Sequence, residues 1–187
     1  MFDLIKRIGT FFLDTIETVV VALAIFVVIY LFLVQPHQVK GSSMLPNFID
    51  GEYILTDKIS NRFKNYELGD VIVFKAPKDH EIDFIKRIIG LPGDVVKISA
   101  GKVYVNNTLL REKYLPVDFT TNPGMFLRND SDIIVPPNEY VVLGDNRNHS
   151  SDSREWGFVK KEEIIGKAWF RYWPVSQVGF VPKIDYK

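Results

Sequence analysis

The chain opens with one long apolar stretch and continues with short apolar runs separated by polar turns. From Thr18 to Val34 no side chain is charged. A helix rises about 1.5 Å per residue, so this stretch with its flanks approaches the ~30 Å hydrocarbon thickness of a bilayer. We therefore predict a transmembrane helix at residues 15–35, an N-terminal segment at residues 1–14 and a single folded domain at residues 36–187.

Two other interpretations of the apolar stretch are a signal-like segment and the buried helix of a soluble domain. A cleavable signal has an apolar stretch of about 7 to 15 residues followed by small residues at the cut. Here Gln35-Pro36-His37-Gln38 follows instead, which favours a retained span. Lys6 and Arg7 precede the span and Lys40 follows it, so the positive-inside rule gives only a weak orientation.

Beyond the span the pattern is typical of a mainly β domain, with almost no sustained helical periodicity. A hairpin is predicted at Ala100-Gly101, because these turn residues separate two apolar runs. Residues 106–135 mix Pro, Asn, Thr and aromatics without a clear period and are interpreted as a variable insertion. The candidate strands are Tyr53–Thr56, Val71–Phe74, Phe84–Ile89, Val95–Ile98, Lys102–Val105, Tyr140–Leu143 and Ile165–Phe170.

Composition narrows the possible functions. Lys plus Arg equals Asp plus Glu, at 23 each, and no basic stripe occurs, so a nucleic-acid partner is not expected. The chain has no cysteine, which excludes disulfides, a thiolate nucleophile and cysteine-based metal sites. No metal and no cofactor are predicted.

Ser43 is a candidate nucleophile, because it stands only nine residues beyond the apolar stretch. A serine hydroxyl needs a base within hydrogen-bond reach. We interpret His37 and His80 as surface residues, and His149 as poorly placed to act on its sequence neighbour Ser150.

Lysine is the alternative base, provided that burial lowers its pKa from roughly 10.4. Lys86 lies in the most apolar strand candidate, and strand alternation puts it on one face with Phe84 and Ile88. A lysine whose amine reaches out to solvent is the competing interpretation of this position.

Three segments of the chain together suggest a family. The segments are Gly41-Ser42-Ser43-Met44-Leu45-Pro46 after the span, Asp83-Phe84-Ile85-Lys86-Arg87-Ile88-Ile89-Gly90-Leu91-Pro92-Gly93-Asp94, and Gly144-Asp145-Asn146-Arg147-Asn148-His149-Ser150-Ser151-Asp152-Ser153-Arg154-Glu155-Trp156-Gly157. In this order they resemble the sequence boxes of bacterial type I signal peptidases, peptidase family S26. Gly69-Asp70-Val71-Ile72-Val73-Phe74 is similar to a fourth box.

The resemblance implies a Ser/Lys dyad with Ser43 as nucleophile and Lys86 as general base. The backbone N–H of Ser43 would be an oxyanion donor, since Gly41 stands where some members have a hydroxyl. Ser42 would be an uninvolved neighbour.

Supporting residues also carry over from the resemblance. Ser150 would orient the lysine, Asp152 and Arg154 would form an ion pair, and Asp145 would hold Arg87.

The resemblance further implies a mostly antiparallel β catalytic domain with a variable β subdomain, outside the cytoplasmic membrane, with the N-terminus inside. The expected activity is removal of signal peptides from exported preproteins, after small residues at positions one and three before the scissile bond. A self-cleaving Ser/Lys repressor would need a DNA-binding domain in place of the span. A membrane-anchored binding module without activity remains the non-enzymatic alternative.

Overall fold

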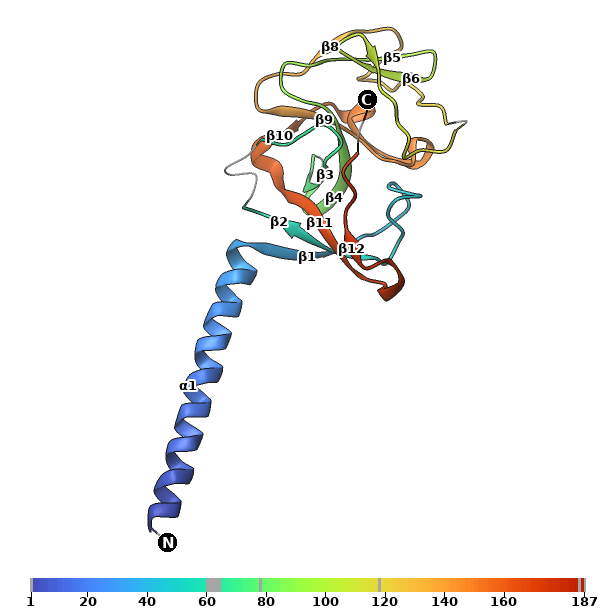
Figure 1. The fold of residues 1–187 in the computed structure, drawn as a ribbon. Helices are drawn as coiled ribbons and strands as arrows, with labels where there is room; N and C mark the ends of the chain where they lie inside the picture. Colours follow the sequence, from blue (N-terminus) through green and yellow to red (C-terminus); the bar gives the residue numbers. More distant parts are fainter. Residues whose placement is uncertain (1, 60–64, 78, 118, 185, 187) are drawn as a thin grey trace.

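The computed structural model describes residues 2–59, 65–77, 79–117, 119–184 and 186. One long helix, α1 (Phe2–Phe32), extends away from a β domain (Figure 1). Its segment Lys6–Tyr30 is long and apolar enough to cross a membrane, and none of it is buried by the rest of the chain. The helix therefore begins and ends earlier than residues 15–35, and Gln35 is already part of a strand.

A large antiparallel sheet forms most of the domain. Its strand order is β1-β2-β11-β3-β4-β9-β10, and β12 pairs with β11. The strands are β1 (Val34–Gln38), β2 (Tyr53–Asp57), β3 (Val71–Ala76), β4 (Asp79–Gly90), β9 (Glu139–Leu143), β10 (Val159–Lys160), β11 (Ile164–Trp173) and β12 (Gly179–Phe180).

A smaller antiparallel sheet lies at the end of the domain remote from α1 (Figure 1). Its order is β7-β6-β5-β8, from β5 (Val95–Ser99), β6 (Lys102–Val105), β7 (Thr108–Leu109) and β8 (Ile133–Ile134). The predicted hairpin is confirmed, because Ser99 pairs with Lys102 across Ala100 and Gly101, both at positive φ.

Short helices complete the described chain. They are η1 (Arg147–His149), α3 (Ser153–Trp156), η2 (Lys161–Glu163) and η3 (Val175–Gln177).

The predicted fold class, a mainly β domain behind one apolar helix, is confirmed. Each of the seven candidate strands coincides with a strand of the structure, within a few residues at its ends. The structure adds β1 and the two-residue strands, which the hydrophobic pattern does not reveal.

Strand β4 passes through the middle of the core. Its second half is buried on both faces. Ile85 packs in one apolar cluster with Met44 and Phe48, whereas Ile88 packs in another cluster with Phe74. Lys86 and Arg87 belong to this buried half, so their charged side chains lie inside the domain.

Candidate active site

A groove with a volume of about 680 Å³ runs between β1 and β4. Its apolar walls are formed by Val39, Ile54, Val73 and Ile85. Ser43 and Lys86 also line it. Two segments 43 residues apart in the sequence thus bring their candidate reactive groups into one open cavity.

The side chains of Ser43 and Lys86 meet directly. Nζ of Lys86 lies 2.8 Å from Oγ of Ser43, and its other hydrogen bond is donated to the carbonyl of Ile85, at 2.9 Å. Strand β4 carries the lysine, and the turn that follows β1 carries the serine. This distance suits proton transfer between hydroxyl and amine.

Burial tunes the amine. Lys86 is 4% exposed, and its Nζ lies 5.0 Å from the centroid of the Phe84 ring. Burial lowers the pKa of Lys86 to about 8, although the carboxylates of Asp152 and Asp145 partly oppose this shift. The competing interpretation, a lysine that reaches solvent, is therefore wrong.

An ion pair supports the site from below β4. Arg87 donates to both carboxylate oxygens of Asp145, at 2.8 and 2.6 Å, and also to the carbonyl of Gly69. Both side chains are almost fully buried. Asn47 donates to the same carboxylate, at 2.9 Å, so the turn carrying Ser43 is tied to Asp145.

A second ion pair holds the loop that follows β9. Nε of Arg154 lies 2.8 Å from Asp152, which also accepts from the N–H of Gly144. Ser150 lies in this loop with a buried Oγ that makes no hydrogen bond to any residue in the described ranges. No hydrogen bond joins Ser150 to Lys86, so an orienting role for that serine stays a prediction.

The backbone around the nucleophile is held by the same loop. The N–H of Asn146 donates to the carbonyl of Ser43, and its side chain donates to the carbonyl of Ser42. Within the described part of the chain, no acceptor takes the N–H of Ser43. Gly41 and Ser42 are exposed.

One prediction about the histidines is wrong. His37 is not a surface residue, since its side chain is only 12% exposed and lines the groove. It contacts Thr56 at 2.9 Å and Asp83 at 3.4 Å. Burial lowers its pKa, against the opposing charge of Asp83. His80 is exposed at the start of β4, and His149 is exposed in η1.

Sequence reasoning missed Arg147 and its partner Glu112. Arg147 has a fully buried side chain that forms a salt bridge with Glu112 beneath the loop holding Ser150. The segment around Glu112 has no periodicity and lies outside the segments that resemble the family. The one available signal is that a buried arginine needs a carboxylate partner, so burial of Arg147 would have pointed to an acidic residue.

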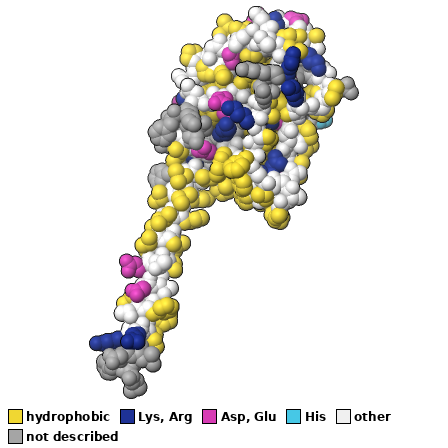
Figure 2. Space-filling model, viewed as in Figure 1, with side chains coloured by type: hydrophobic (Ala, Val, Ile, Leu, Met, Phe, Trp, Pro, Cys, Tyr) yellow, Lys and Arg dark blue, Asp and Glu magenta, His cyan; other side chains and the backbone are white. Residues whose placement is uncertain are grey.

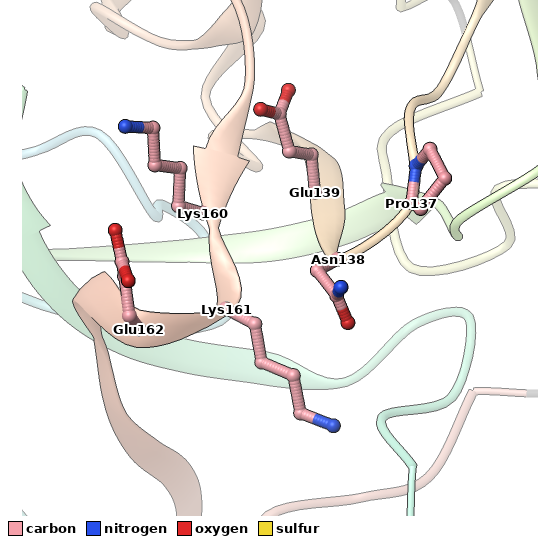
Figure 3. Close-up of a pocket in the computed structure, with 6 residues that line it drawn as sticks. All are labelled: Pro137, Asn138, Glu139, Lys160, Lys161 and Glu162. Atoms are coloured by element: carbon pink, nitrogen blue, oxygen red, sulfur yellow. The ribbon is translucent and has the colours of Figure 1, made fainter.

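A second hollow, of about 410 Å³, lies between the loop before β9 and η2 (Figure 3). It is lined by Pro137, Asn138, Glu139, Lys160, Lys161 and Glu162. It shares no lining residue with the groove and contains no hydroxyl nucleophile. Among the described residues, no group of His, Asp or Glu is arranged to hold a metal ion.

Comparisons with known proteins agree on one family. Residues 12–173 match the family described as signal peptidase, peptidase S26. The probable signal peptidase I-2 of Synechocystis sp. is 40% identical over 88% of this chain and 75% of the relative. Signal peptidase IB of Staphylococcus aureus is 35% identical over 88% of this chain and 91% of the relative.

A crystal structure of a signal peptidase I from Enterococcus faecalis V583 aligns at 31% identity and a TM-score of 0.47, over 56% of this chain and 97% of that chain. The family match spans most of the chain, and both relatives exceed 30% identity. The chain therefore belongs to the signal peptidase family, peptidase S26, and is an enzyme of that family.

Proposed function

We propose that this enzyme is a membrane-bound serine endopeptidase that removes N-terminal signal peptides with a dyad of Ser43 and Lys86. The observation that carries the proposal is the 2.8 Å contact between Oγ of Ser43 and the buried amine of Lys86. A serine paired with a lysine of lowered pKa has the nucleophile and the base that peptide-bond cleavage needs.

In the proposed reaction, the neutral amine of Lys86 takes the proton of Ser43 as Oγ attacks the scissile carbonyl. The backbone N–H of Ser43 stabilises the oxyanion. Lys86 then passes its proton to the leaving amine, and an acyl-enzyme remains. Water hydrolyses this ester, with Lys86 again the base.

The two ion pairs have positioning roles in this proposal. Arg87 holds the carboxylate of Asp145 in place, and this carboxylate accepts a hydrogen bond from Asn47. Asn47 belongs to the turn that carries Ser43, so the ion pair fixes the position of that turn. Asp152 and Arg154 fix the loop that brings Ser150 toward the dyad.

The unpartnered hydroxyl of Ser150 is expected to accept from the amine when substrate is bound. The buried hydroxyl of Ser150 would then have a partner, as buried polar groups generally do.

The groove suits a substrate that lies along it with apolar side chains against its walls beside the dyad. Small residues at positions one and three before the scissile bond are proposed from the resemblance to the family. The groove continues along β1, which follows α1 directly in the chain. A substrate lying along β1 would therefore reach the dyad from the side of the domain at which α1 joins it.

A lipid bilayer is the second proposed partner. We assign the apolar part of α1 to the membrane, with the N-terminus inside and the domain of residues 36–187 on the extracytoplasmic side. Large apolar side chains are exposed near the paired strands β11 and β12, on the side of the domain where α1 joins β1 (Figures 1 and 2). They include Trp169, Trp173, Val175, Val178 and Phe180. Amphipathic aromatics are favoured at membrane interfaces.

The decisive test is cleavage of a preprotein with small residues one and three positions before the cut. Detergent-solubilised full-length enzyme is compared with Ser43→Ala, Lys86→Ala and the exposed control Ser42→Ala. We expect processing by wild type and Ser42→Ala only. A folded wild type that leaves the preprotein intact would instead support the inactive binding module.

A further inference from the structure

The strongest unassigned feature is a buried arginine that joins the Gly144–Ser150 loop to an irregular segment, described at residues 111–117 and 119–121. Arg147 lies in η1, between Asp145 and Ser150, and its side chain is 0% exposed. Its five N–H groups all find acceptors, which is the full donor capacity of a guanidinium. The acceptors are Glu112, Tyr114, Thr121 and the carbonyl of Gly144.

Most of these acceptors come from a distant part of the chain. Glu112 receives two hydrogen bonds in a fork, Tyr114 contacts both Glu112 and Arg147, and Thr121 contacts the remaining side. Residues 111–117 and 119–121 have no helix or strand, so these side-chain bonds are what attach the segment to the loop. A bidentate arginine–carboxylate pair fixes orientation as well as distance.

The loop that Arg147 anchors touches the reaction centre tightly. A Cβ placed on Gly144 would come within 2.1 Å of Oγ of Ser150 and 2.5 Å of the carbonyl of Ser43. The backbone carbonyl of Arg147 accepts from Arg154 at 2.6 Å. The loop is thus held on one side by Arg154 and on the other by Glu112, and a small displacement would be transmitted to both serines.

We infer that Glu112 is a positioning residue for catalysis, which acts through Arg147 to hold the Gly144–Ser150 loop against the dyad. The inference rests on the proposed peptidase function. It assigns the irregular segment a task at the active site, although no residue of that segment lines the groove.

The test uses full-length enzyme in detergent and the variants Glu112→Gln and Thr121→Val. Glu112→Gln keeps the shape but removes the charge, and Thr121→Val removes one milder contact if the first variant does not fold. The matched control is Asp132→Asn, which breaks an exposed pair with Lys97 in the small sheet.

We expect Glu112→Gln to lower kcat about tenfold or more with KM within about twofold, and Thr121→Val to lower kcat less. The acid limb of kcat should move to higher pH, because a displaced loop admits water to Lys86, and burial is the main cause of its lowered pKa. Asp132→Asn should match wild type in all three measurements. A purely structural role would lower the folded fraction without moving the pH profile.

A double-mutant cycle with Ser150→Ala completes the test. If Glu112 acts through the loop, Glu112→Gln should add little to the loss caused by Ser150→Ala. Unchanged kcat in folded Glu112→Gln or Thr121→Val, or full additivity in the cycle, would overturn the inference. Failure of the proposed function is recognised separately, since wild type itself would then show no cleavage above Ser43→Ala.

Discussion

The pH dependence of turnover is the most direct consequence of the buried amine. In the proposed mechanism only the neutral amine of Lys86 has the lone pair that accepts the Ser43 proton, so activity should rise as pH rises through the pKa of Lys86. That pKa lies at about 8 because burial disfavours the ammonium form.

The size of the effect follows from this pKa. At pH 7 about 9% of the enzyme would carry neutral Lys86, and at pH 9 about 91%, given a pKa of about 8. We therefore expect kcat/KM to increase about tenfold from pH 7 to pH 9, with the slope of a single proton.

The assay is kcat/KM for a signal-peptide substrate between pH 5.5 and 10, with His37→Gln measured beside wild type. His37 is the competing titratable group in the groove, and its pKa is lowered below 6.5. A limb that lies below pH 6.5 and disappears in His37→Gln would refute the assignment of Lys86 as base. A profile that is flat, or that rises only above pH 10, would refute the burial argument.

Other expected outcomes concern the buried groups around the dyad. Lys86→Met should raise the free energy of unfolding by up to about 3 kcal/mol at pH 7. The reason is that burial lowers the pKa of Lys86 from 10.5 to about 8, and each pKa unit corresponds to about 1.36 kcal/mol. The folded state disfavours the ammonium, so this gain should shrink as pH rises from 8 to 10.5, measured by denaturant titration. Gly144→Ala should destabilise by about 1–3 kcal/mol through its clash with Ser150 and reduce turnover, measured by thermal unfolding and peptide cleavage. Asp145→Asn should destabilise by about 3–5 kcal/mol, because it leaves the buried Arg87 guanidinium without its charged partner; an unchanged melting temperature would contradict this.

The strands were predictable because each carries its own local pattern. β4 shows this best, since apolar residues flank Lys86 and Arg87 on both sides in the sequence. β1 was not predictable in this way. Its first residue, Val34, ends the apolar run of α1, the rest of it is Gln35-Pro36-His37-Gln38, and its strand state depends on pairing with β2. Tertiary pairing of this kind leaves no periodic trace in one short segment.

The same distinction between local pattern and distant pairing applies to the candidate site. The resemblance boxes supplied Ser43 and Lys86, and the buried strand supplied a physical reason for the lowered pKa of the lysine. The environment of His37 was not predictable, because the groove that buries it is built from strands distant in sequence. Glu112 was missed for the same reason, since its role depends on a partner 35 residues away.

Strand β1 connects helix α1 to the segment that carries Ser43. The chain leaves α1 at Phe32, enters β1 at Val34 and forms one wall of the groove before it reaches Ser43. Because β1 is paired along its length with β2, α1 is joined by ordered strand to the short turn that carries Ser43. If α1 spans the bilayer as proposed, the fold would therefore set the depth of Ser43 and Lys86 relative to the membrane surface. That would suit the proposed substrate, a signal peptide whose scissile bond lies at a fixed distance from its own apolar segment.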